Sequence, residues 1–235
     1  MIEYVGPSRT LGTQWAVCGI AAAAARFVPV PLVDDVIRER ALRIAISRTL
    51  RAHDQPYSTA LLQPLWGDGD EDGGFVRRYA RELGTKLVLY PVRKYRALFG
   101  AVHGVPNDVM RVLLMARTVD RRLAGGELRD ADPAVLAEQA RRIRVAFDSA
   151  MRGMDLRMLR SALADVLSQG KGLTVAAVKY ARRGFGRRGA EPTLEPGGAV
   201  GEGAEQVSAV LRRPEIILLL DRFDQKVDAA LATSG

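Results

Sequence analysis

Cysteine and histidine are scarce in this sequence. Its 235 residues contain one cysteine, Cys18, and two histidines, His53 and His103. A single cysteine excludes an intramolecular disulfide and any metal site built from a pair of cysteines, so we expect a reducing compartment. The H-E-x-x-H pattern of zinc hydrolases is absent, and neither histidine is accompanied by a serine nucleophile elbow or by an acid at a recognisable spacing.

Long apolar runs are also lacking. The run from Trp15 to Ala25 has eleven residues and is followed by Arg26, whereas a helix needs about 20 apolar residues to span a bilayer. Glu3 and Gln14 spoil the basic leader that a secretory signal peptide would have. We therefore expect a cytoplasmic protein, whose attachment to the inner face of the membrane, where it occurs, is peripheral.

Phosphate-binding glycine loops are missing. Gly170 and Lys171 are followed by Gly172 rather than by serine or threonine, and the upstream glycine of a P-loop is absent. Gly184-Phe185-Gly186 continues with Arg187 and follows no strand, so it is not a dinucleotide loop. No cofactor is expected.

Positive charge, in contrast, is in excess. The formal net charge is +8 and the pI is near 10, with thirty arginines against five lysines. A basic excess of this size favours polyanionic partners, either an anionic membrane surface or nucleic acid. Because the arginines are spread along every expected helix, arginine-rich usage across the whole proteome is the simpler explanation for much of the excess.

Hydrophobic periodicity predicts an all-α fold, a multi-helix globular bundle. We expect Asn107, Asp132 and Asp155 to cap three helices, and Gly170 to end the last of them. In the helix whose first turn contains Pro31, the side chains of Arg40, Arg43, Ser47 and Arg51 should lie opposite the apolar face. The residues expected to point inward are Val33, Ile37, Ala41, Ile44, Val109, Val112, Leu113, Ala116, Leu123, Leu136, Ala140, Ile143, Phe147, Leu156, Leu159, Leu163 and Val166.

Three regions follow from this pattern. Residues 1–185 form the helical domain, in which Phe75 to Leu83 is a short helix and Lys86 to Tyr90 is either a strand or a helix start. Residues 186–206 are rich in glycine and proline, which predicts a flexible linker. Residues 207–235 form a C-terminal amphipathic helix with Ile216, Leu219, Leu220, Phe223 and Val227 on its apolar face.

An Ala/Gly-rich segment, the step Pro29-Val30-Pro31, the acids Asp34 and Asp35 and then a basic helix follow one another near the N-terminus. Over roughly residues 12–125 this order resembles the helical domain of EcsC-like proteins, and it is similar to the YcjF type of bacterial inner-membrane proteins. The resemblance implies a helical protein tied to membranes or to membrane-associated partners, without implying an activity. The YcjF type carries transmembrane hairpins, and this sequence departs from it by having none.

A basic segment from Lys171 to Arg188 is the strongest functional candidate. It contains no acid, and Tyr180 and Phe185 lie between its charges. Such a segment can lie on anionic lipid headgroups, or grip phosphates and stack on bases. A basic helix end that runs into a solvated linker with Glu191, Glu195 and Glu202 is an equally weighted alternative. The predicted anion-binding residues are Lys171, Lys179, Arg182, Arg183, Arg187, Arg188, Arg40 and Arg43.

Asp68, Asp70 and Asp72, followed by Gly73, match the opening half of a calcium loop. The closing bidentate glutamate would have to be residue 79, which is Tyr79. A solvated acidic loop is therefore the simpler interpretation.

The sequence thus predicts a peripheral membrane-surface or membrane-complex-associated adaptor or scaffold without catalysis. The first alternative is a nucleic-acid-binding protein that uses residues 171–188. The second is an enzyme with an unrecognised site around His53, Asp54 or Asp35. The sequence sets neither the partner protein nor the oligomeric state.

Overall fold

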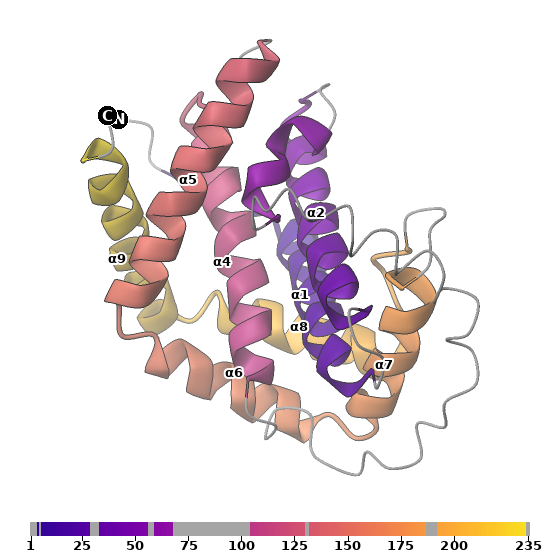
Figure 1. Ribbon diagram of the computed structural model, residues 1–235. Helices are drawn as coiled ribbons and strands as arrows, with labels where there is room; N and C mark the ends of the chain where they lie inside the picture. Colours follow the sequence, from indigo (N-terminus) through magenta and orange to yellow (C-terminus); the bar gives the residue numbers. More distant parts are fainter. Residues whose placement is uncertain are drawn as a thin grey trace.

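The computed structural model describes residues 4, 6–28, 33–55, 59–67, 104–129, 132–186 and 192–233. The described residues form helices and contain no strand, which confirms the predicted all-α, multi-helix fold (Figure 1). The elements are α1 (Arg9–Ala24), η1 (Ala25–Phe27), α2 (Val33–Ala52), η2 (Thr59–Leu65), α4 (Val105–Ala124), α5 (Pro133–Gly153), α6 (Arg157–Gln169), α7 (Leu173–Gly184), α8 (Gly198–Val210) and α9 (Pro214–Ala232).

Helix α1 is the central element. From Trp15 to Ala24 it is apolar on all sides, and α2, α4, α7 and α8 pack around it. A helix that is hydrophobic all round is stable only when it is buried, and every residue from Trp15 to Ala24 is buried. Small side chains let the neighbours come close: a Cβ atom added at Gly19 would lie 3.1 Å from Cγ1 of Val109. The Ala/Gly-rich run is therefore a packing element.

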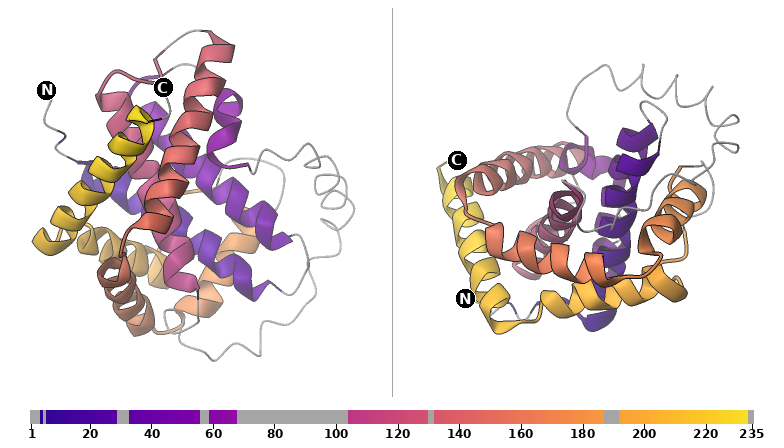
Figure 2. Two further views of the ribbon diagram at one scale, coloured as in Figure 1. Left: turned by 60° about the vertical axis from the view of Figure 1, so that its left-hand side comes forward. Right: turned by 90° about the horizontal axis from the view of Figure 1, so that it is seen from below.

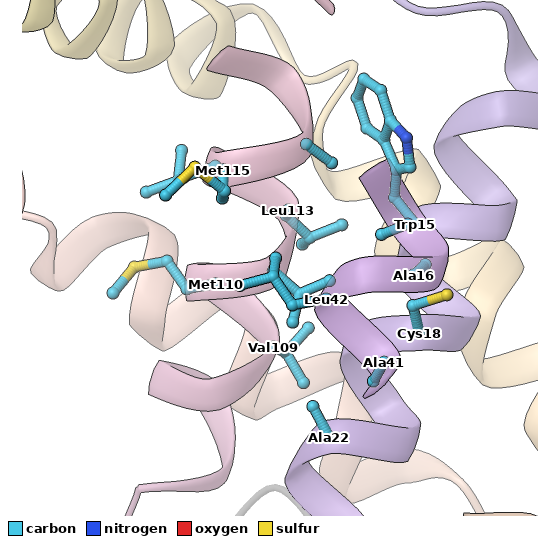
Figure 3. Close-up of a cluster of buried hydrophobic side chains, with 14 of the residues drawn as sticks. Trp15, Ala16, Cys18, Ala22, Ala41, Leu42, Val109, Met110, Leu113 and Met115 are labelled. Carbon is cyan, nitrogen blue, oxygen red and sulfur yellow. The ribbon is translucent and has the colours of Figure 1, made fainter. Parts of the chain in front are cut away.

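The contact of α1 with α2 and α4 forms the main part of the core. Figure 3 shows a cluster of buried side chains from the three helices, with Trp15, Cys18 and Ala22 on α1, Ala41 and Leu42 on α2 and Val109 and Leu113 on α4; Ala22 lies next to Val109. The one polar atom of the Trp15 side chain is satisfied, because Nε1 donates to Oγ1 of Thr49 at 2.9 Å. That hydrogen bond fixes the register of α1 on α2 without leaving a buried donor unpaired.

The helix starts agree with the sequence at one of three positions. Asp132 is the N-cap of α5, and its side chain accepts from the Ala134 N–H at 2.8 Å, as predicted. Asn107 is not a cap, because α4 already begins at Val105. The N-cap is Gly104, whose φ of +93° lies in the left-handed region that favours glycine. Asp155 lies one residue before the N-cap of α6, although its Oδ1 still accepts from the Arg157 N–H at 3.0 Å.

The predicted flexible linker is wrong for residues 198–206. They belong to α8, whose Val200, Gly203 and Ala204 are buried. At Gly203 an added Cβ would lie 3.3 Å from the terminal methyl groups of Leu173, so the absence of a side chain lets α8 lie close to α7. The glycines that suggested flexibility thus permit close packing of α8.

The C-terminal helix α9 is confirmed as amphipathic, with all five predicted apolar residues buried. It packs along α5, where the rings of Phe147 and Phe223 meet edge to face with centroids 5.7 Å apart. Figure 2 shows α5, α6 and α9 arranged around α4 on the side away from α2. The helix is part of the fold.

Two further expectations concern α2 and the segments around it. Ser47 is buried rather than on the polar face, because α1 and α4 both pack on α2 and widen its buried side. The Pro29–Pro31 step, the short helix at 75–83 and the segment 86–90 lie outside the described residues.

Candidate functional site

Four of the basic residues that the sequence singled out lie on α7 or in the turn just before it. Lys171, Lys179 and Arg183 are exposed, and Arg182 is half-buried. The opposite face, formed by Leu173, Thr174, Ala177, Val178 and Ala181, is buried against the core. No acid lies in α7, so its exposed side chains carry charge of one sign. We call Lys171, Val175, Lys179 and Arg183 the α7 face.

The aromatic residues of the basic segment are not available for stacking on bases. Phe185 is fully buried, which contradicts its predicted role. Tyr180 is half-buried, and its ring meets that of Phe185 edge to face, with the ring centroids 5.8 Å apart. Its hydroxyl donates to the Thr193 carbonyl. Burial raises the pKa of Tyr180, the nearby Cys18 raises it further, and the charge of Arg48 opposes the shift. Both rings fix α7 to its neighbours.

The other predicted anion-binding residues lie elsewhere. Arg40 and Arg43 are on α2, a different helix, where Arg43 is exposed and Arg40 half-buried. Near the start of α2, Arg38 donates to Asp34 and Asp35 at 3.0 Å each, so these acids pair within the helix. Arg187 and Arg188 lie outside the described residues.

A largely buried ionic cluster, which the sequence did not reveal, joins the N-terminal segment, the turn after α2, α4 and α9. We call Tyr4, His53, Arg117, Asp120 and Asp224 the Arg117 cluster. Nε2 of His53 lies 2.7 Å from Oδ1 of Asp120, and the Tyr4 hydroxyl donates to the other oxygen of that carboxylate. Arg117 donates to Asp224 at 2.8 Å and lies 4.9 Å from the centre of the Tyr4 ring. The acid that His53 contacts is therefore Asp120 of α4, which is distant from His53 in the sequence.

A second set of ion pairs continues this cluster along α4 and α9. Arg121 binds Asp228 with two hydrogen bonds, of 2.8 and 2.7 Å, and Arg122 donates to the same carboxylate. Burial raises the pKa of Asp228, but the hydrogen bonds and charges of Arg121 and Arg122 outweigh it and hold the pKa below its usual value. Burial raises the pKa of Asp224 despite Arg117 and Arg121. These pairs connect helices, and none of them creates a reactive nucleophile.

The environment of Tyr4 gives a titration that can be tested. Burial, followed by the charge and hydrogen bond of Asp120, raises the pKa of Tyr4 above its ordinary value of about 10. Stability from this proton is complete below about pH 10 and is lost as the pH rises toward the folded-state pKa. We expect Tyr4→Phe to leave the rise in absorbance at 295 nm between about pH 9 and about pH 11 unchanged. A loss of one tyrosine's worth of amplitude would show that Tyr4 ionises normally.

Metal and membrane-spanning sites were also predicted or weighed from the sequence. Asp68, Asp70 and Asp72, which match the opening half of a calcium loop, lie outside the described residues. Within the part of the chain that the structure describes, no three metal-binding side chains converge. Within the same part, no helix has the length and hydrophobicity needed to cross a bilayer.

Comparison with known proteins identifies no relative of this chain. No family model matches the chain, and neither the curated proteins nor the solved structures contain a match. Function must therefore be argued from the charge and shape of the described surface.

Proposed function

We propose that the protein is a peripheral adaptor or scaffold that docks electrostatically on an anionic membrane surface through the α7 face. The observation that carries the proposal is the one-sided charge of this helix. Lys179 and Arg183 are exposed on one side of α7, while Leu173, Ala177, Val178 and Ala181 on the opposite side are buried in the core. The sequence resemblance to EcsC-like proteins supports the same location. The proposal assigns no catalytic step.

The chemistry of the α7 face favours lipid headgroups. Val175 is 47% exposed in the middle of the basic residues, so it offers an apolar contact at the level of the headgroups. Each lysine or arginine near an anionic surface contributes about 1 kcal/mol. Lys171, Lys179 and Arg183 together therefore give reversible, salt-sensitive binding of roughly 3 kcal/mol.

Nucleic acid is the alternative polyanion, and the described residues support it less. Sequence-independent binding of single strands combines a basic groove with aromatic rings on which bases stack. The rings of Phe185 and Tyr180 are occupied within the fold. The α7 face keeps the charges and lacks the stacking platform.

Sedimentation with vesicles tests the proposal. We expect the wild-type protein to pellet with vesicles that contain phosphatidylserine and to remain in solution with phosphatidylcholine alone. Binding should weaken when salt rises from about 0.1 M to about 1 M, because the Debye length falls from about 10 Å to about 3 Å. Lys179→Glu/Arg183→Glu should remove most of the binding.

A matched control separates the α7 face from net charge. Arg141 and Arg152 are exposed on α5, so Arg141→Glu/Arg152→Glu changes the net charge by the same amount elsewhere. We expect this variant to keep most of the vesicle binding. Equal losses in both variants, or binding to a DNA duplex without binding to anionic vesicles, would show that the proposal is wrong.

A further inference from the structure

The outer side of α9 carries two apolar side chains that the fold does not use. Ile217 is 42% exposed and Leu218 is 62% exposed, whereas Ile216, Leu219 and Leu220 beside them are buried. Figures 1 and 2 show α9 at one edge of the molecule, with no other described helix over its outer side. Two exposed apolar residues are common on protein surfaces, so the charges around them decide which partner fits.

Two opposite charges flank Leu218 at nearly symmetrical positions. Glu215 lies three residues before it and Arg222 four residues after it, and both side chains are exposed. Seven residues are about two helical turns, so the two charges lie on the same flank of α9, about 10 Å apart along its axis. Among the described residues neither side chain has a hydrogen-bond or ion-pair partner. Both charges are therefore available to a partner.

This arrangement is self-complementary about a two-fold axis. In an antiparallel pair of identical helices, residues equally far before and after the axis face each other. An axis beside Leu218 places Glu215 of one copy opposite Arg222 of the other, and the symmetry forms the same ion pair a second time. The two Leu218 side chains meet at the axis. A parallel pair would instead bring like charges together, which is unfavourable.

We propose that the outer face of α9, formed by Glu215, Ile217, Leu218 and Arg222, binds a second copy of this chain as a two-fold, antiparallel helix pair. A contact limited to one helix buries less than the roughly 800 Å² per partner of a standard interface. The dimer is therefore reversible and forms at about 10 to 100 μM protein. Helix α7 lies on the other side of the molecule, so pairing leaves the α7 face accessible (Figures 1 and 2).

Sedimentation-velocity ultracentrifugation of the full chain tests the proposal. Between about 5 and about 500 μM protein we expect the sedimentation coefficient to rise as monomers pair. Arg222→Glu and Glu215→Arg should each raise the dissociation constant of the dimer at least about 10-fold, because each replaces two attractive contacts by two repulsive ones. Arg152→Glu makes the same charge change as Arg222→Glu at an exposed position of α5 and should alter the constant less than about 3-fold.

Mixing the two single variants distinguishes pairing between copies from any other effect of charge. The Arg222→Glu variant has two acids on this face, and the Glu215→Arg variant has two cations. Their heterodimer restores both ion pairs, whereas neither variant pairs well with itself. We expect the mixture to sediment as a dimer at a concentration at which each variant alone is monomeric. Equal helix content by circular dichroism separates lost pairing from lost folding.

Three results would overturn the proposal: a wild-type protein that is monomeric up to about 500 μM, a mixture that does not pair, or an equal loss of pairing in Arg152→Glu. A Leu218→Ser variant that no longer pellets with phosphatidylserine vesicles would also overturn it, because the membrane would then cover this face. A monomeric wild type that still pellets through the α7 face would overturn the dimer alone and leave the membrane proposal standing.

Discussion

Replacing Asp224 by alanine is expected to lower the free energy of unfolding by about 3 kcal/mol, because the change leaves a buried guanidinium without its main partner. Arg117 is 8% exposed and Asp224 is 4% exposed. The pair is made by two hydrogen bonds from Arg117, of 3.2 and 2.8 Å, to the same carboxylate oxygen. Removing one partner of a buried pair costs far more than the pair contributes net, since the remaining charge stays desolvated. Urea unfolding of wild type and variant measures the difference.

Asp221 provides the matched control for this prediction. It accepts from the same Nη2 atom of Arg117 at 3.3 Å, but its side chain is 53% exposed. Asp221→Ala should therefore change stability by less than about 1 kcal/mol. A second variant tests the mechanism directly: replacing Arg117 and Asp224 together by methionine and leucine should recover most of the loss, because no buried charge remains. Equal losses for Asp221→Ala and Asp224→Ala would contradict the burial argument.

The sequence predicted the inward-facing apolar residues of α4 correctly, but it did not predict the buried charged residues of the Arg117 cluster. Val109, Leu113, Ala116 and Leu123 are correctly predicted to lie inward. Asp120 lies four residues after Ala116 and three before Leu123, and so on the same stripe of the helix. Helical spacing alone contains the signal for a buried acid at 120. It cannot name the partner, because His53 is 67 residues away in the chain.

The linker error has a different physical origin. Glycine and proline lower helix propensity, so composition favoured a flexible segment before the last helix. Helix α8 nevertheless forms because α1, α6 and α7 pack against it. Tertiary burial outweighs weak local preference here, and local preference is all that a single sequence shows.

For the candidate site, the sequence identified the basic residues of α7 correctly, but it did not predict that the aromatic residues between them are packed into the fold. The basic stretch of α7 was evident from composition, and the structure adds that its charges share one exposed side. The burial of Phe185 could not be predicted, because the sequence around an aromatic residue between basic residues is the same whether its ring stacks on a ligand or packs in the core.

Replacing Gly19 by leucine is the second change with a large expected effect, a loss of about 3 kcal/mol, at the upper end of the range for overpacked cores. An added Cβ would lie 3.1 Å from Cγ1 and 3.2 Å from the backbone oxygen of Val109. A side chain beyond Cβ has no room unless α1 and α4 move apart. Because α1 also contacts α2, α7 and α8, such a movement would loosen several interfaces at once.

Gly12, on the same helix, provides a control: comparing substitutions at Gly12 and Gly19 separates the effect of the close contact with α4 from the gain in helix propensity. Alanine in place of glycine within a helix gains up to about 1 kcal/mol. At Gly12 the nearest neighbour of an added Cβ is the Ser208 hydroxyl at 3.2 Å, a side-chain atom that can rotate away. At Gly19 the neighbour includes backbone, which cannot. We expect Gly12→Ala to be neutral or stabilising and Gly19→Ala to be less stable than Gly12→Ala, with Gly19→Leu far below both in urea unfolding. If all three unfold at the same urea concentration, α1 and α4 are not in backbone contact, and the small residues of α1 would need another explanation.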